Sequence, residues 1–329
     1  MSKNLIINGL LKEDLETLAS QIALWENMTI WNVAHKKLKG VYTSIDEINK
    51  EIEEDKRTLF RKHKRNPSAL EAKILKSLCD HLSIDTTKVK SIGDLVDLGE
   101  EIEKRVILLQ KKISKDKFRG DSIQELIQFN LKRMFDDLSK NFATKGVEDQ
   151  KEIVKRIVKV LEEMPDEQKE ILRKKLNVDK ITDQAVAKAI ITGALGVGFA
   201  AVVEVAGFSA FIFAVEALAA TAGLVGLTLP FAAYTTLTSI MAALANPFLI
   251  IPATLGLGYF LTERANKQIH DALLPILITQ IAVSSSKEGN IISKDEKLIR
   301  KLKSISKKEN TYFTKAGSWI KSLRKRSKK

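Results

Sequence analysis

The sequence predicts an all-α protein in which an N-terminal helical bundle precedes a long hydrophobic helical hairpin and a basic C-terminal tail. Two observations predict this class. From the N-terminus to Lys180, apolar side chains recur three or four positions apart, and no strand pattern of comparable strength appears. The long segment between Lys188 and Glu263 contains only two charged side chains, Glu204 and Glu216. The expected domains are a soluble helical domain at 1–182, a membrane-inserting hairpin at 183–265, and an apolar segment with a basic amphipathic tail at 266–329.

The net charge of +13 is concentrated at the C-terminal end. From Lys287 to Lys329 there are fifteen Lys or Arg and four Asp or Glu, so the part of the chain before Lys287 carries only +2. A basic segment beside an apolar hairpin favours an anionic lipid surface as partner, whereas a basic surface spread over a domain would favour nucleic acid. The single cysteine, Cys79, excludes an internal disulfide and fits a reducing compartment. No cleavage site follows the N-terminal apolar run, so we expect the chain to start in the cytoplasm.

The first predicted helices present one apolar face each. Leu15, Leu18, Ile22 and Trp25 share a helix face, which predicts core packing; a ligand role for Trp25 or Trp31 is the alternative. Capping boxes, in which a Ser and a Glu three residues later satisfy first-turn N–H groups, predict three helix starts. These boxes are Ser44 with Glu47, Ser68 with Glu71, and Ser122 with Glu125.

The last part of the predicted bundle contains three helices. One runs from Ser122 to Phe142 and another from about Val147 to Met164, each with apolar residues along one face. Pro165 lacks an N–H and is predicted to occupy the first position of the next helix.

The hairpin is long enough to cross a membrane twice. At a rise of about 1.5 Å per residue, a continuous helix between Lys188 and Glu263 would extend for about 110 Å, against a hydrocarbon core of about 30 Å. Gly226 and Pro230 mark a break, so the predicted spans are about 190–222 and 232–262. An even number of spans keeps the bundle and the basic tail on the same side, which the positive-inside rule assigns to the cytoplasm. We therefore expect an integral protein with both termini cytoplasmic.

Two glutamates and one asparagine, Glu204, Glu216 and Asn246, interrupt the hairpin. A carboxylate within the hydrocarbon region usually faces an aqueous path or a protein interior. These residues are the predicted pore or intramembrane polar positions, in a homo-oligomer. The alternative is that the glutamates lie near the membrane surfaces, are neutralised, or pair with Lys188 or Arg264.

The segments after the hairpin are too short to span. Ala272–Val283 is apolar but contains Pro275, and is predicted to be interfacial or packed. From Phe313 onward, apolar residues at helical spacing precede a basic end, which suits a membrane surface; the alternative is a solvated tail. The predicted lipid-binding residues are Trp319, Lys321, Arg324, Lys325, Arg326, Lys328 and Lys329.

The sequence carries no recognisable catalytic pattern. The histidines are scattered, and Cys79 with His81 supplies only two of the three or four ligands that zinc needs. No phosphate-binding loop or nucleophile elbow is present. We therefore predict no catalytic residues, no metal site and no cofactor, and we expect that the protein is not an enzyme.

Three stretches, at 69–82, 162–172 and 274–282, together resemble the YaaW-like uncharacterised bacterial proteins, which are associated with the ubiquinol–cytochrome c chaperone grouping. The resemblance covers about two thirds of the chain. It implies a helical front, then an apolar stretch rich in small residues and a proline-containing segment, and it transfers no catalytic residues. This chain departs from the family in its longer hairpin and basic tail. The plan is also similar to that of pore-forming colicins, in which a helical bundle shields an apolar hairpin.

The sequence favours a membrane-inserting helical protein, either a pore-forming or a permeability-altering effector, regulated by its soluble helical domain. One alternative is a membrane-anchored scaffold or assembly factor whose bundle binds a protein partner. The other is a soluble, chaperone-like helical protein that buries the hairpin.

Overall fold

The computed structural model describes residues 4–27, 45–114, 117–206, 213, 214, 217, 259–285 and 294–305. All secondary structure in these residues is helical, and none of them lies in a strand. The predicted all-α class is therefore confirmed. Most of the predicted hairpin and the whole basic end of the tail lie outside the described residues.

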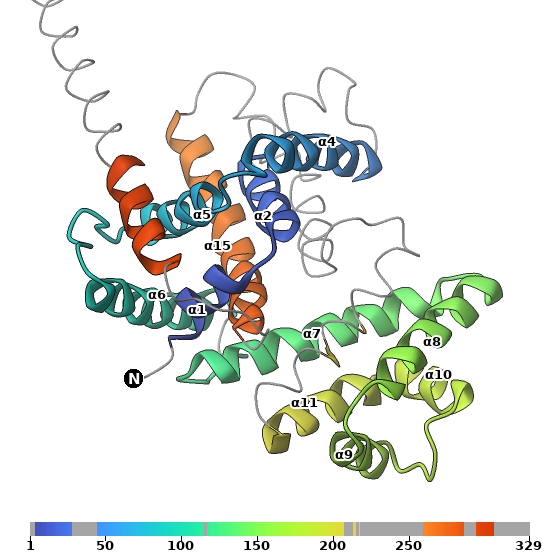
Figure 1. Ribbon diagram of the computed structural model, residues 1–329. Helices are drawn as coiled ribbons and strands as arrows, with labels where there is room; N and C mark the ends of the chain where they lie inside the picture. Colours follow the sequence, from blue (N-terminus) through green and yellow to red (C-terminus); the bar gives the residue numbers. More distant parts are fainter. Residues whose placement is uncertain are drawn as a thin grey trace, which may run out of the picture.

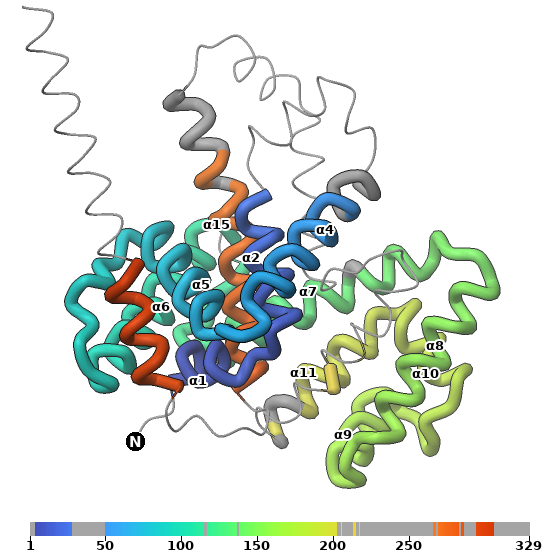
Figure 2. Tube along the Cα trace, turned by 45° about the horizontal axis from the view of Figure 1, so that its top comes forward, coloured from blue at the N-terminus to red at the C-terminus, as the bar shows by residue number. Residues whose placement is uncertain are grey.

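One group of helices packs around α15, which begins in the last residues of the apolar stretch (Figures 1 and 2). The group consists of α1 (Leu5–Lys12), α2 (Leu15–Asn27), α4 (Ile45–His63), α5 (Ser68–His81), α6 (Ile92–Ile113) and α15 (Tyr259–Ser284). α15 contacts α1, α2, α5 and α6. The helical residues 294–305 lie beside α5 and α6 in both views, and bury Leu298 and Leu302 in the core. A segment near the C-terminus therefore completes a core that the N-terminal helices begin.

A second group contains the start of the apolar stretch. It consists of α8 (Val147–Glu162), α9 (Asp166–Leu176), α10 (Asp183–Ile191) and α11 (Ala194–Ala206). The long helix α7 (Ile123–Ala143) connects the two groups (Figure 1). The Asn130 amide donates to the Thr279 hydroxyl of α15 at 3.0 Å. Nearer the other end of α7, Phe135 stacks on Phe199 of α11 with ring centroids 5.0 Å apart.

Serine capping boxes open two of the helices. Ser122 Oγ accepts from the Glu125 N–H at 3.2 Å and Glu125 Oε2 accepts from the Ser122 N–H at 3.0 Å, as predicted. Ser91 and Asp94 form the same reciprocal pair at the start of α6, with an aspartate in place of the glutamate of the predicted pattern. Ser44, in the third predicted box, lies outside the described residues.

The capping box predicted at Ser68 is wrong. α5 already begins at Ser68, with Pro67 as its N-cap, and the Ser68 hydroxyl donates to Asn66 Oδ1 at 2.9 Å. Glu71 therefore has no N-cap partner to reach back to. Its side chain is buried instead, only 3% exposed, and Oε2 has no hydrogen-bond partner among the described residues.

Two predicted helix boundaries differ from those in the structure by a few residues. Pro165 is the N-cap of α9, which begins at Asp166, so the proline precedes the helix instead of occupying its first position. The first predicted span, about 190–222, contains a bend that the sequence did not predict: the chain turns by 102° between α10 and α11. Gly193 lies in this bend with φ +73°, a conformation that glycine adopts without steric cost. The straight segment begins at Ala194.

Within the described part of the chain, no single helix is both long and apolar enough to cross a membrane. Residues 183–191 and 194–202 meet the length and composition requirement only together, as the bent pair. Most of the remaining residues of the predicted spans, including all of 232–258, lie outside the described residues.

The apolar segment Ala272–Val283 is packed inside the protein, which confirms the packed alternative. It forms the second half of α15, and its leucines and isoleucines are buried. Gly9 of α1 lies directly against it: a Cβ at Gly9 would overlap the Ile281 carbonyl. α15 contains the predicted domain boundary at 265/266 and packs on the N-terminal helices. α10 begins just after the predicted boundary at 182/183 and packs on α7 and α8, which lie before it. The domain division stays a prediction.

Candidate functional site: a tryptophan–histidine cluster on the last core helix

The residues predicted to act in the membrane fall almost entirely outside the described part of the chain. Glu204 lies in α11, but its side chain is outside it. Glu216, Asn246 and the tail residues 319–329 are outside it as well. Their roles stay predictions.

The structure instead brings together four side chains from α2, α5 and α15, here called the Trp–His cluster: Trp25, His81, His270 and Asp271. His81, the last residue of α5, and Asp271, in α15, form a hydrogen-bonded pair, with 2.8 Å between Nε2 and Oδ1. A carboxylate oxygen only accepts, so His81 Nε2 is the donor. The two side chains are 9% and 19% exposed, so water screens the pair only in part. This pair joins α5 to α15.

Trp25 and His270 join α2 to the same turn of α15. Their rings stack with centroids 4.1 Å apart and an interplanar angle of 10°. His270 Nε2 lies 3.1 Å from the Trp25 carbonyl oxygen, which can only accept, so the neutral imidazole carries its proton on Nε2. His81 meets both rings edge-on, at 5.4 Å from Trp25 and 5.7 Å from His270. The three rings therefore form one contiguous contact among three helices.

The surroundings of His270 favour the neutral form of its imidazole. Burial lowers the pKa of His270 from 6.5 to about 4, because removing water disfavours the imidazolium. Its hydrogen bond to the Trp25 carbonyl and the Asp271 carboxylate act in the opposite direction, and His81 adds to the lowering. His270 is thus held uncharged at neutral pH in the contact that fastens α15.

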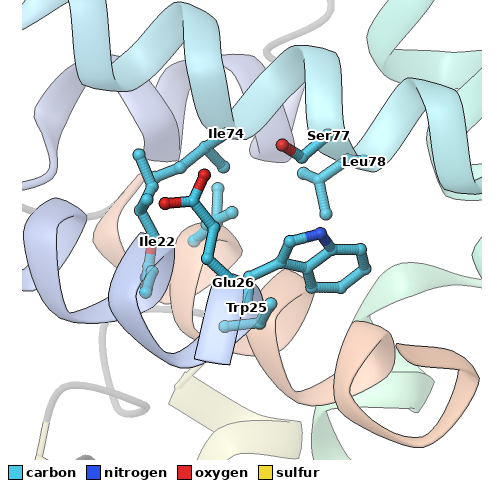
Figure 3. A pocket seen from close by; sticks show the side chains of 9 residues that line it. Ile22, Trp25, Glu26, Ile74, Ser77 and Leu78 are labelled. Atoms are coloured by element: carbon cyan, nitrogen blue, oxygen red, sulfur yellow. The ribbon is translucent and has the colours of Figure 1, made fainter. Parts of the chain in front are cut away.

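A small pocket lies beside the cluster between α2, α5 and α15 (Figure 3). Ile22, Trp25 and Glu26 line it from one side, and Ile74, Ser77 and Leu78 from another. The Glu26 carboxylate points toward α5, where it pairs with Lys73 at 2.6 Å. The cavity of about 10 Å³ is close to the space of one water molecule and far below the 300–1,000 Å³ or so of small-molecule sites. The pocket therefore does not accommodate a metabolite-sized ligand in this conformation.

Other reactive groups near the cluster do not form a reactive centre. Cys79 is fully buried, and burial raises the pKa of its thiol to about 12, so the nucleophilic thiolate is disfavoured at neutral pH. Among the described residues, no three His, Cys, Asp or Glu side chains are arranged to hold a metal ion. The cluster is suited to holding helices together in a pH-dependent way.

Sequence reasoning identified one member of the cluster and missed the arrangement. Trp25 was expected on an apolar face, and it does pack against the core. His81 and His270 were interpreted as scattered, because Asp271 lies far along the chain from the histidine that it binds. Only the apolar face around Trp25 and the apolar segment after Asp271 were visible as signals that these helices could meet.

Comparison with known proteins adds no assignment. No family model matches the chain. No curated protein and no solved structure matches it either. The resemblance to the YaaW-like proteins stays a prediction.

Proposed function

We propose that this protein inserts into membranes through the segment between Lys188 and Glu263, and that its helical bundle controls the insertion. The observation that carries the proposal is the length of this segment together with its content of only two charges. Charged side chains are costly in the hydrocarbon region, and a segment of this length with so few of them is typical of membrane proteins. The basic tail, with Trp319 and its neighbouring lysines and arginines, would contact the anionic headgroups.

The helices at both ends of the segment support control by the bundle. At its start, α11 contacts α7 and α9. At its end, the Trp–His cluster fastens α15 to α2 and α5. The far end of α15 is held as well: the Ser284 hydroxyl donates to Glu13 at 2.8 Å, and Lys12 Nζ donates to the Ser285 carbonyl at 2.8 Å. Rearrangement of the segment in a membrane is therefore coupled to the contacts of the bundle.

Two liposome assays test the proposal. The purified chain should float with vesicles of phosphatidylcholine and phosphatidylglycerol, and remain bound after a wash in high salt, which screens purely electrostatic binding. Release of an entrapped dye from the same vesicles would support a pore-forming effector. Salt-resistant binding without dye release would support a membrane-anchored scaffold or assembly factor instead. A chain that stays with the aqueous phase in both assays would refute insertion.

The two glutamates distinguish a pore from tolerated charges. If Glu204 and Glu216 line a water-filled path in an oligomer, Glu204→Gln with Glu216→Gln should abolish cation preference across planar bilayers without reducing insertion. If the charges are only tolerated, the same substitutions should leave ion selectivity unchanged and make insertion more favourable, since an amide is less costly to bury than an ion.

A further inference from the structure

An open groove lies where α9 turns into α10. Asn177 follows the last residue of α9 with φ 53°, a left-handed conformation that asparagine tolerates, and this reverses the chain. Thr182 then caps α10 by accepting from the Ala185 N–H at 3.2 Å. The groove between the two helices has a volume of about 1130 Å³. The charged side chains that line it are Glu170, Arg173, Lys174, Asp179, Lys180 and Lys188.

The groove has an excess of positive charge. Glu170 is already bound by its neighbours: Arg173 Nη2 donates to its carboxylate, and Lys174 Nζ lies 3.5 Å away. The hydrogen bond from Arg173 holds the pKa of Glu170 below its usual range, so this carboxylate stays ionised and paired. Lys180 and Lys188 are both exposed, and neither forms an ion pair with another residue that the structure describes. These two lysines are the cations that the groove offers to an anion.

The same helix leads from the groove to exposed apolar side chains. Lys188 and Ile191 are one turn apart on α10, so they share its outward face. Ile191 is 61% exposed, and Val197 and Val205 on α11 are 51% and 70% exposed. A lysine followed by an exposed isoleucine, at the point where the uncharged segment begins, matches the polar-to-apolar order of a membrane surface.

We propose that this groove binds the phosphate headgroup of an anionic phospholipid, through Lys180 and Lys188, and places Ile191 against the lipid chains. The inference rests on the proposed membrane insertion and adds a binding site for anionic lipid outside the basic tail. Charge complementarity selects an anionic lipid, because a zwitterionic headgroup carries its own cation. The exposed isoleucine selects a lipid over a soluble anion, which would leave that side chain in water.

Vesicle flotation of the full chain tests the site. The groove variant carries Lys180→Gln and Lys188→Gln, and the matched control carries Lys155→Gln and Lys159→Gln, which remove two exposed charges from α8. A lysine near an anionic surface contributes about fivefold in affinity, so the groove variant should bind equimolar phosphatidylcholine–phosphatidylglycerol vesicles about 25-fold more weakly. The control should change far less, and neither should alter binding to pure phosphatidylcholine. A variant with arginine at both groove positions should bind like the unaltered chain and show that charge is the requirement.

The outcomes separate this inference from the function on which it rests. Equal losses in the groove variant and the control would overturn the groove and leave insertion standing. No flotation of the unaltered chain with either vesicle would overturn insertion itself. Calorimetric binding of inorganic phosphate that the groove variant loses, with unchanged flotation, would assign the groove to a soluble anion. Binding to a short DNA duplex that only the groove variant loses, again with unchanged flotation, would assign it to nucleic acid. Both assignments would refute the lipid site.

Discussion

Replacing His270 with phenylalanine should make the fold less sensitive to acid. Phenylalanine keeps an aromatic ring against Trp25 but cannot be protonated and cannot donate to the Trp25 carbonyl. Loss of that hydrogen bond should lower stability by about 1 kcal/mol at every pH. The pH-dependent part of the change is separate, and it comes from the pKa of His270.

The magnitude follows from linkage between protonation and folding. In the folded protein the pKa of His270 is about 4, against 6.5 for an unburied histidine. Between these values the unfolded chain binds the proton more readily, so stability is kept above pH 6.5 and is lost as the pH falls toward 4. At about pH 5 the loss amounts to about 2 kcal/mol, and the full shift corresponds to about 3 kcal/mol.

Urea unfolding of the full chain, followed by tryptophan fluorescence at about pH 7.5 and about pH 5, measures this pH-dependent loss of stability. The difference in unfolding free energy between the wild type and His270→Phe should move by about 2 kcal/mol in favour of the variant on acidification. Titrating groups that do not interact with His270 are common to both chains and cancel in this comparison. His63→Phe is the matched control, because that histidine is less buried and its pKa is lowered less. Parallel pH profiles for the wild type and His270→Phe would refute the role assigned to His270.

Three further substitutions and one deletion test other parts of the structure. Burial raises the pKa of Glu71 from 4.5 to about 7, so stability from this group is lost as the pH rises from 4.5 through 7. Glu71→Gln should therefore raise the unfolding free energy in urea titrations much more at about pH 8 than at about pH 5. Ser122→Ala removes one half of a capping box and should lower the urea-unfolding free energy by about 1 kcal/mol. Gly9→Ala forces α1 away from the Ile281 carbonyl and should lower the thermal midpoint, with a cost of about 1–3 kcal/mol or more. Deleting residues 318–329 should weaken flotation with anionic vesicles more than with neutral ones, and an equal loss on both would contradict a lipid-binding tail.

Periodicity and local capping predicted the all-α class and some of the helix starts. The apolar spacing predicted the all-α class, and the Ser122–Glu125 box placed the start of α7 correctly, because a cap depends on residues within one turn. The box at Ser68 failed for an equally local reason: Pro67 already serves as the N-cap, and the Ser68 hydroxyl turns to Asn66. A sequence pattern shows which groups can form hydrogen bonds, but it does not show which partner each group has in the fold.

The packing of the helices against one another could not be predicted from the sequence. The packing of α15 among the first helices of the chain depends on side chains that are far apart in the sequence, as in the His81–Asp271 pair. The groove between α9 and α10 was missed because its lysines are ordinary solvated charges until the turn at Asn177 brings Lys180 and Lys188 into one groove. The uncharged stretch was visible from composition alone, since absence of charge is a property of the residues and not of their arrangement.

Alkaline carbonate extraction of membranes from cells that produce the full chain tests the central proposal most directly. Carbonate strips proteins that are held by charge alone, whereas a segment embedded in the hydrocarbon core is retained by the apolar surface that it buries. Membrane insertion predicts that the chain stays in the membrane pellet after carbonate and after high salt. Recovery of the chain in the supernatant as a stable monomer would contradict it, and would favour a fold that buries the segment between Lys188 and Glu263 within the protein.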